Sequence, residues 1–432
     1  MAHTPTSLTN FDELLKDVIQ PMIIQTKPER SAFRNRLQTL IPTNAYGGRY
    51  FELRTRYDNM GSTAALAEGD ALPVAYNGTW DAMRIPFSYQ YGSVSVYGPA
   101  IARSSSDLYA NADALAESIL VMTRSFNQHI NRQLCGDGNG ILCQMDGDDN
   151  GSGALTVDNA GGWSGYNASA VNGDKYLTTG MYIQSRDSGG TVENAGLLIT
   201  AITPGAFPST SAILTVTGTS TSVDDGSYLY RAASATASND SYGHEMAGVK
   251  LLIDDNTVAA TVQSISATDY TEWRSQVGYG STPGTAEALT TDRMNILLSE
   301  QQMRGGGSLD FIACSQGVWL TYGKLGDQSA SIMAPSRSAA SFDSAYPTLN
   351  FNGVDVFPEL YMADEMYFID TSTLALYQAM EQGWIDYGGQ SIRQVAGYDQ
   401  MEANWRWYVN LGITNRAKNA KMTDISVTAN VK

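Results

Sequence analysis

Residues 106–140 read SDLYANADALAESILVMTRSFNQHINRQLCGDGNG, and the rest of the chain is organised around this stretch. Its apolar residues recur at steps of three or four, and no glycine or proline interrupts them before Gly136. This spacing places the apolar side chains on one face of an α-helix, which from Leu108 to Leu134 would span about 40 Å at roughly 1.5 Å per residue. We therefore expect one long amphipathic helix against which a sheet packs. Its apolar positions are Leu108, Ala112, Leu115, Ile119, Met122, Phe126, Ile130 and Leu134.

A glycine-rich run at residues 136–140 follows this helix. Glycine-rich loops that bind phosphate precede a helix and offer its N-terminal amides, so this run predicts a helix stop and a turn instead. Just beyond, Asp146, Asp148 and Asn150 match the first half of a calcium-binding loop. The twelfth position of that loop, which requires a bidentate glutamate, is Val157. We expect a solvated acidic turn, and we leave open whether these three residues bind a cation.

The composition is that of a loop-rich β protein of 432 residues, with room for roughly three domains. Only 16% of the residues are charged, below the usual share of about a quarter. The 27 Lys and Arg against 44 Asp and Glu give a formal net charge of −17. Such an acidic chain would be repelled by nucleic acid, so the charge argues against a dedicated nucleic-acid binder.

The three cysteines, Cys135, Cys143 and Cys314, show no CxxC spacing. We expect them to be reduced and buried in a cytosolic protein, and a disulfide between Cys135 and Cys143 remains the alternative.

The first residues lack a basic segment followed by an apolar run, and no stretch approaches 18 consecutive apolar residues. We therefore expect neither export by an ordinary signal nor a membrane span.

No set of residues in this sequence requires an enzyme. The only histidines are His3, His129 and His244, too few for a histidine-based metal site, and no GxSxG motif is present. His129 lies beside the apolar stripe of the long helix, where a packed or hydrogen-bonded role is expected. We predict no catalytic residue, no cofactor and no metal ligand.

The N-terminal part contains a short amphipathic segment at residues 11–22, FDELLKDVIQPM, followed by four basic residues. This segment cannot bury its apolar side alone. It either packs on its own domain or forms an arm on a neighbouring subunit. The basic group consists of Lys27, Arg30, Arg34 and Arg36.

Two strand-like runs, at residues 50–57 and 82–97, predict a long hairpin joined by the polar segment 58–80. Two strands bury little surface, so this hairpin should lie against another part of the chain or against another chain.

Residues 151–237 contain four short strand-like runs, at 181–185, 197–203, 212–217 and 227–231. These runs predict a small β-barrel or sandwich.

The last third alternates helix and strand. We expect helices at 291–304 and from 316, a short strand at 309–314, an Asn-Gly hairpin turn at Asn352-Gly353, and a buried strand at 366–370. Near the end, residues 401–411 alternate apolar and polar side chains as a long strand would, and this strand could lie along the long helix.

This order of elements resembles the major capsid proteins of tailed bacteriophages that share the Hong Kong 97-like fold. The resemblance is carried by the long helix with its Gly-Asp-Gly stop, the Asn-Gly-Val to Phe-Ile-Asp segment (352–370) and the returning strand at 405–411. It implies an α+β fold with an N-terminal arm, an extended β-hairpin loop, a long spine helix in a peripheral domain, an α/β axial domain and an inserted small β domain.

By this resemblance the chain divides into seven segments. They are the arm (1–44), the extended loop (45–98), the peripheral domain with its spine helix (99–150), the inserted β-rich domain (151–237), the continued peripheral domain (238–290), the axial domain (291–395), and the returning strand with the C-terminus (396–432).

The resemblance implies a structural protein that assembles with itself, as hexamers and pentamers, into the icosahedral head shell around the phage genome. It would be assembled in the host cytoplasm and located in the virion. Further expected partners are a separate scaffolding protein and a portal protein, and a decoration protein is left open. Packaged DNA would be contacted only weakly and without specificity. Because only about 45 residues precede the hairpin, we also expect no cleavage of this chain.

We expect the subunit interfaces to involve Lys27, Arg30, Arg34, Arg36, Arg54, Arg56 and Trp80. Two other functions stay open. A secreted or cell-surface β-rich adhesin or glycan-active protein would fit the content of Gly, Ser, Thr, Asn and Tyr, although no signal peptide is seen. A shell protein similar to encapsulins would share the fold and differ in its cargo.

Some members of the family crosslink their subunits by an isopeptide bond from a lysine on the extended loop. This sequence has no lysine between Lys27 and Lys175. Denaturing gels of assembled particles should therefore show no covalent ladder that peptide mapping traces to residues 50–97. A crosslinked peptide from that region would contradict this prediction.

Overall fold

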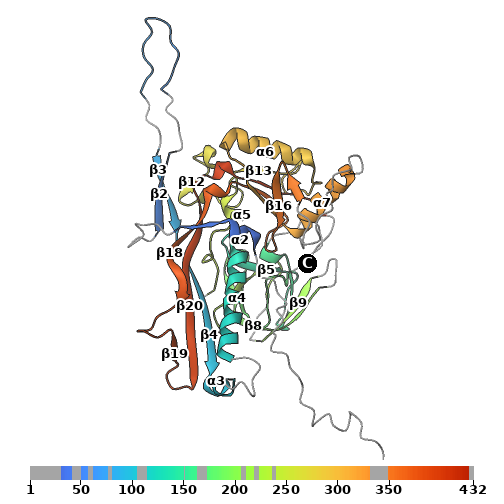
Figure 1. Cartoon of the computed structure of the whole chain (residues 1–432). Coiled ribbons are helices and arrows are strands. Elements are labelled where there is room, and N and C mark those ends of the chain that lie inside the picture. Colours follow the sequence, from blue (N-terminus) through green and yellow to red (C-terminus); the bar gives the residue numbers. More distant parts are fainter. Residues whose placement is uncertain are drawn as a thin grey trace, which may run out of the picture. The chain divides into compact units, whose positions relative to one another are not determined.

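The computed structural model describes residues 31–40, 50–56, 62–75, 80–104, 114–149, 151–162, 173–205, 211–217, 223–235, 240–330 and 349–427 (Figure 1). The amphipathic segment expected at residues 11–22 lies outside this part of the chain, as do Lys27 and Arg30. The chain forms two compact units. Of the described residues, unit 1 holds those within 91–128 and 383–406, and unit 2 holds those within 31–90, 129–382 and 407–432.

The long helix is α4, Ala114–Cys135, whose 22 residues give a length of about 33 Å. Its predicted apolar stripe is buried at Phe126, Ile130 and Leu134. The helix ends at Cys135, where the predicted stop begins, and the amide of Gly136 donates to the carbonyl of Gln133 at 3.0 Å. Residues 105–113, which include the predicted first turns, lie outside the described part. A separate short helix, α3 (Gly98–Ser104), precedes them.

The expected hairpin consists of β2 (Tyr50–Arg56) and β3 (Trp80–Pro86), which pair antiparallel as a two-stranded ribbon. The prediction that its second strand continues to residue 97 is wrong. Among the described residues this ladder runs to the pair Tyr50 and Pro86, and proline has no amide hydrogen to donate to a ladder. The chain then begins a new strand, β4 (Ser88–Tyr97), which pairs with β20 (Gln400–Ile413) instead.

Strand β20 is the long returning strand, and it lies in a sheet of five strands ordered β1-β18-β20-β19, with β4 also paired to β20. The remaining members are β1 (Gln38–Leu40), β18 (Leu374–Trp384) and β19 (Ile392–Gln394). Within unit 1, Ala403 of β20 shares a hydrophobic cluster with Val94 of β4 and with Ile119 and Met122 of α4. In this unit the returning strand therefore packs with the long helix, as the alternating pattern suggested.

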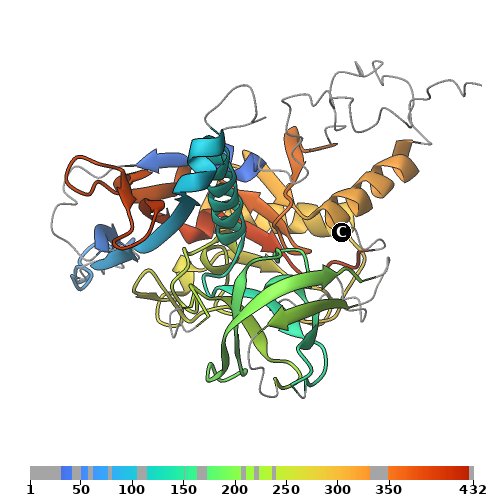
Figure 2. The same cartoon turned by 90° about the horizontal axis from the view of Figure 1, so that it is seen from below.

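Six short strands close into a barrel in the order β10-β5-β6-β9-β8-β7 (Figure 2). Strands were predicted where β7, β8, β9 and β10 lie, whereas β5 and β6 were not foreseen. Hydrophobic side chains such as Leu155, Ile183, Leu197 and Leu214 are buried in it. The strands are β5 (Ile141–Met145), β6 (Ala154–Asp158), β7 (Tyr182–Arg186), β8 (Val192–Thr203), β9 (Ala212–Thr217) and β10 (Tyr228–Arg231).

A second sheet has six strands in the order β13-β21-β17-β14-β16-β15, and α6 and α7 contribute side chains to its hydrophobic core. The predicted turn at Asn352-Gly353 joins β15 and β16, and both residues have positive φ (50° and 84°), as an Asn-Gly hairpin turn requires. The elements are β13 (Gln276–Gly278), α6 (Thr291–Gly305), β14 (Phe311–Cys314), α7 (Gln316–Ala330), β15 (Leu349–Phe351), β16 (Val354–Pro358), β17 (Met366–Ile369) and β21 (Ala420–Met422).

Buried charges link the last strand of this sheet to a segment far away in sequence. The ammonium of Lys421 in β21 lies 2.8 Å from the carboxylate of Asp254, which follows the short helix α5 (Val249–Leu252). The guanidinium of Arg416 donates to the carbonyls of Leu252 and Asp254, each at 2.7 Å. All three charged side chains are buried. Next to this segment, β11 (Thr261–Val262) and β12 (Ile265–Ser266) form a small hairpin.

The three cysteines are buried and none forms a disulfide, as expected. Burial raises the pKa of the Cys143 and Cys314 thiols, which disfavours the thiolate. Among the described residues, no helix is both long enough and apolar enough to cross a membrane.

Two leucines of α4 provide a matched test of its packing. Leu134 is fully buried, whereas Leu120 is 41% exposed. Replacing Leu134 by Ala removes buried methyl groups and leaves a cavity, so we expect a loss of about 2–5 kcal/mol in the free energy of unfolding. Leu120→Ala should cost no more than about 1 kcal/mol. Urea unfolding of the purified protein measures both values, and equal losses would contradict the assigned burial.

Candidate functional site

The basic residues Arg34 and Arg36 belong to the short helix α2 (Ala32–Arg36). A buried carboxylate holds the start of this helix to the body of unit 2: Glu359 accepts from the hydroxyl of Ser31 at 3.0 Å and from the amide of Phe33 at 3.1 Å. Burial raises the pKa of Glu359, and these two hydrogen bonds oppose the shift because they favour the carboxylate. Phe33 is fully buried beside this carboxylate.

Both arginines of α2 contact aromatic rings of their own unit. The guanidinium carbon of Arg34 lies 5.6 Å from the centre of the Trp407 ring, and Arg36 lies 5.6 Å and 5.5 Å from the rings of Phe311 and Phe357. Cation–π contacts of this kind stabilise by about 0.5–1 kcal/mol at exposed sites. Helix α2 therefore packs on its own unit, whereas the segment 11–22, for which two roles were left open, lies outside the described residues.

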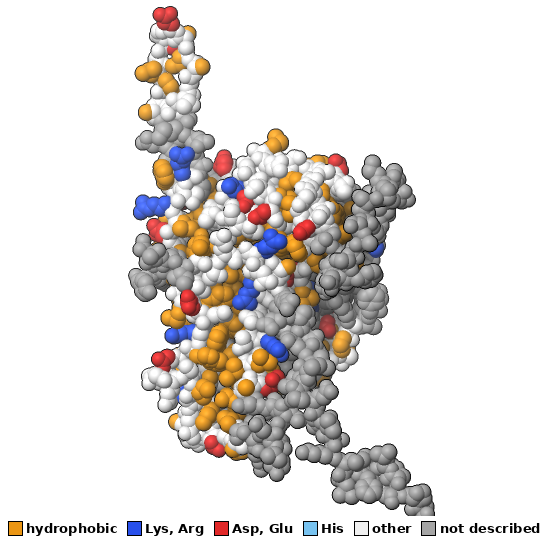
Figure 3. All heavy atoms as spheres, viewed as in Figure 1, with side chains coloured by type: hydrophobic (Ala, Val, Ile, Leu, Met, Phe, Trp, Pro, Cys, Tyr) orange, Lys and Arg blue, Asp and Glu red, His pale blue; other side chains and the backbone are white. Residues whose placement is uncertain are grey.

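Arg54, Arg56 and Trp80 come together on one face of the β2–β3 ribbon. Arg56 and Trp80 are directly opposite in the register, with the guanidinium 5.8 Å from the indole ring centre, and Arg54 lies two residues along the same strand. All three side chains are exposed, Trp80 by 68%. Figure 3 shows Lys and Arg side chains at the base of this ribbon.

Three more residues share this outer face and were missed by sequence reasoning. Arg84 lies 3.5 Å from the carboxylate of Glu52 and 4.9 Å from the ring centre of Tyr50. The two-residue alternation along each strand was the signal that could have identified them. On the inner face, Phe51 and Ile85 are buried in one hydrophobic cluster of unit 2 and Met83 in another.

The described part of the loop between β2 and β3, residues 62–75, exposes apolar side chains. Leu72 and Val74 are 87% and 89% exposed. The carboxylate of Asp70 accepts from the amide of Ala67 at 3.0 Å, and the amide of Asp70 donates back to the carbonyl of Ala67 at 3.2 Å, so this part forms a tight turn. Glu68 and Asp70 are exposed beside these apolar side chains.

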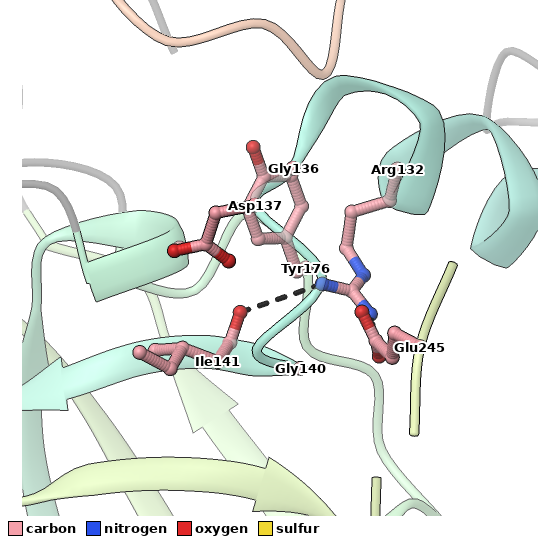
Figure 4. A pocket seen from close by; sticks show the side chains of 8 residues that line it. Arg132, Gly136, Asp137, Gly140, Ile141, Tyr176 and Glu245 are labelled. Atoms are coloured by element: carbon pink, nitrogen blue, oxygen red, sulfur yellow. Dashed lines mark hydrogen bonds and ion pairs between the residues drawn. The ribbon is translucent and has the colours of Figure 1, made fainter. Parts of the chain in front are cut away.

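A small cavity of about 10 Å³ lies at the C-terminal end of α4, with room for roughly one water molecule (Figure 4). Arg132 forms a buried ion pair with Glu245 there and also donates to the carbonyl of Ile141 at 3.4 Å. Burial raises the pKa of Glu245, and Arg132 opposes that shift. Glu245, the acidic residue next to His244, therefore forms an ion pair that belongs to the packing of the fold. The cavity is lined by Arg132, Gly136, Asp137, Gly140, Ile141, Gly161, Tyr176 and Glu245.

His129 is hydrogen-bonded, as expected. The side-chain amide of Gln133 donates to Gln90 at 2.9 Å and lies 2.8 Å from Nε2 of His129. The amide of Met246 donates to the side-chain oxygen of Gln133, which fixes the orientation of this amide, so Nε2 of His129 is the acceptor. Burial and two nearby arginines lower the pKa of His129 well below its ordinary value, consistent with a neutral ring.

In the acidic turn after β5, the carboxylates of Asp146 and Asp148 accept hydrogen bonds from other residues of the protein. Asp146 accepts from the hydroxyl of Ser211, and Asp148 accepts from the amide of Asp225 at 2.7 Å. Asn150, the third residue of the calcium-like pattern, lies outside the described residues. Within the ranges that the structure covers, no group of three or more His, Cys, Asp or Glu side chains is arranged to hold a metal ion.

Comparison with known proteins shows which solved structure shares the fold of this chain. No family model and no curated protein matches the sequence. Among solved structures, the capsid asymmetric unit of cyanophage A-1(L) superposes with a TM-score of 0.61 and 13% identity, over 96% of this chain and 98% of that one. This chain therefore has the α+β fold of a phage capsid protein, which confirms the resemblance at the level of the fold.

Two further similar structures have lower TM-scores. The holo-SrpI encapsulin complex from Synechococcus elongatus PCC 7942 gives a TM-score of 0.48 at 8% identity, over 100% of this chain and 99% of that one. The capsid of a native GTA particle gives 0.48 at 9% identity, over 98% of this chain and 100% of that one. The assignment of the fold rests on the cyanophage structure.

Because of Asp158 at the end of β6, we expect the free energy of unfolding to depend on pH. Burial, together with Asp146 and Asp225, raises its pKa from 3.8 to about 6. Between these values the native state binds more protons than the unfolded chain, so the free energy of unfolding should fall as pH rises from about 4 to about 6. The side chain is partly exposed, so we expect a change of only about 1 kcal/mol after allowing for solvent screening.

Urea unfolding of the purified protein at several pH values tests this dependence. Asp158→Asn should remove it, whereas Asp269→Asn, at an exposed position, should leave it unchanged. A variant with Asn at position 158 that keeps the full pH slope would contradict the assignment.

Proposed function

We propose that this chain is the major capsid protein of a tailed double-stranded DNA phage, many copies of which assemble into the icosahedral head shell around the genome. The observation that carries the proposal is the similarity to the cyanophage A-1(L) capsid, which extends over nearly all of both chains. A structural role of this kind requires no catalytic residue and no cofactor. The protein would be located in the virion.

We assign the elements by analogy with the Hong Kong 97-like fold. The β2–β3 ribbon and its loop would be the extended loop, α4 the spine helix of the peripheral domain, and β20 its returning strand. The six-stranded sheet with α6 and α7 would be the axial domain. The barrel would be the inserted domain, and it includes β5 in addition to strands between residues 151 and 237.

The partners we propose are other copies of this chain, in hexamers and pentamers, with a separate scaffolding protein and a portal protein. A shell has many contacts of modest strength, and their number makes the particle stable. The net charge of −17 limits attraction to packaged DNA to weak, non-specific contact. Among the predicted interface residues, Arg54, Arg56 and Trp80 best suit a subunit interface because they are exposed on one face.

Electron microscopy of the purified protein tests this function. We expect closed particles, capsomers or tubes, because a shell protein carries complementary surfaces that bind its own copies. An adhesin or a glycan-active enzyme would stay monomeric in the same preparation, and size-exclusion chromatography would report this. A protein that remains monomeric at high concentration, alone and with a scaffolding partner, would overturn the proposal.

If closed particles form, their contents separate the phage shell from an encapsulin-like shell. Particles from the natural source should hold DNA that nuclease treatment does not remove. Particles that hold only protein cargo would favour the encapsulin-like function.

A further inference from the structure

The base of the β2–β3 ribbon carries positive charge that its own unit does not neutralise. Arg84 is paired with Glu52, but the side chain of Arg54 makes no hydrogen bond or ion pair with any residue that the structure describes. Arg56 contacts only the indole of Trp80 among these residues. Two exposed guanidinium groups therefore flank an exposed aromatic ring on an otherwise acidic chain.

The described loop at residues 62–75 has the complementary character. It exposes two carboxylates, Glu68 and Asp70, next to the apolar side chains of Leu72 and Val74. Figure 3 shows the acidic and hydrophobic side chains at the tip of the ribbon and the basic ones at its base. Since Leu72 and Val74 are almost fully exposed, these two side chains do not pack on any part of their own chain that the structure describes.

We propose that the tip of one copy docks on the ribbon base of the next copy. The inference rests on the proposed function and deepens it by naming the two surfaces that meet. Glu68 and Asp70 would pair with Arg54 and Arg56, since charge-assisted hydrogen bonds between guanidinium and carboxylate are stronger than neutral ones. The apolar side chains of the tip would cover Trp80, and buried aromatic residues contribute much of the binding energy of interfaces.

The geometry of this contact suits a ring of subunits. The tip and the base are different surfaces of the same chain, so the contact is heterologous, and each copy can bind one neighbour through its tip and another through its base. Heterologous contacts close into rings when the rotation between copies allows it. Rings of this kind are what hexamers and pentamers require.

A charge exchange tests the pairing. The first variant is Arg54→Glu with Arg56→Glu, the second is Glu68→Arg with Asp70→Arg, and the third combines all four substitutions. Each double variant places like charges in contact, so we expect the critical concentration for assembly to rise by roughly tenfold or more. The four-fold variant restores opposite charges and should assemble at close to the wild-type concentration. Light scattering and electron microscopy measure assembly.

A matched control exchanges charges that already pair within one ribbon. Glu52→Arg with Arg84→Glu keeps the internal ion pair and the net charge, and it should leave assembly close to wild type. All of the substituted side chains are exposed, so the urea unfolding midpoint of the unassembled subunit should be unchanged in every variant. A shifted midpoint would reveal a folding defect, and a disulfide experiment then decides the pairing.

In that experiment Arg56→Cys and Asp70→Cys are combined, while the three natural thiols are buried. Oxidised particles should give covalent oligomers on non-reducing gels, and each single cysteine variant should not. Absence of these oligomers in assembled particles would overturn the pairing.

The outcomes separate the two proposals. If the wild-type chain assembles and both double variants assemble equally well, the ribbon base is not an interface and the inference fails alone. If the double variants fail and the four-fold variant is not rescued, the tip meets a different surface and the inference also fails. If the wild-type chain does not assemble, the proposed function fails, and the inference fails with it.

Discussion

The buried pair of Asp254 and Lys421 is the constraint on which much of unit 2 depends. A carboxylate and an ammonium that are both buried are expensive to desolvate, and removing one partner of such a pair typically costs about 3–5 kcal/mol. The pair forms only when β21 meets the segment after α5, which lies 167 residues earlier in the sequence. Arg416 reinforces the same junction through two backbone carbonyls. Because β21 lies between β13 and β17, the six-stranded sheet cannot be completed before this return. Its assembly therefore depends on contacts that are distant in sequence.

A second constraint acts on the ribbon. Two strands have two faces, and the body of the subunit covers only one of them, through Phe51, Met83 and Ile85. The outer face retains Trp80, whose exposure to water is unfavourable, together with arginines that suit a partner. The same strands thus anchor the ribbon to its own subunit and leave a surface free for another molecule. This division between an inner and an outer face follows directly from the two-residue period of a β-strand.

Local patterns predicted local structure well. The long helix and its stop at Gly136, the turn at Asn352-Gly353 and the long returning strand each depend on residues within a short window, and the structure has all of them. The second strand of the ribbon was extended too far because β4 keeps the same alternating pattern as β3, although it pairs with β20. The ring contacts of Arg34 and Arg36 were also missed, since Trp407, Phe311 and Phe357 are hundreds of residues away. Periodicity identifies strands and faces, but it contains no information on which distant partner each of them meets.

The charge distribution bears on the proposed assembly of this chain into a shell. A net charge of −17 means that copies of this chain repel one another on average, so attraction must come from specific places where the sign is reversed. The ribbon base is such a place, because the side chains of Arg54 and Arg56 form no ion pair with any residue that the structure describes, unlike Arg84 with Glu52. General repulsion combined with a few attractive contacts favours one arrangement of subunits over disordered aggregation, since misplaced copies gain repulsion without the compensating pairs. If this chain builds one closed structure from many identical copies, as proposed, this selectivity matters as much as the strength of any single contact.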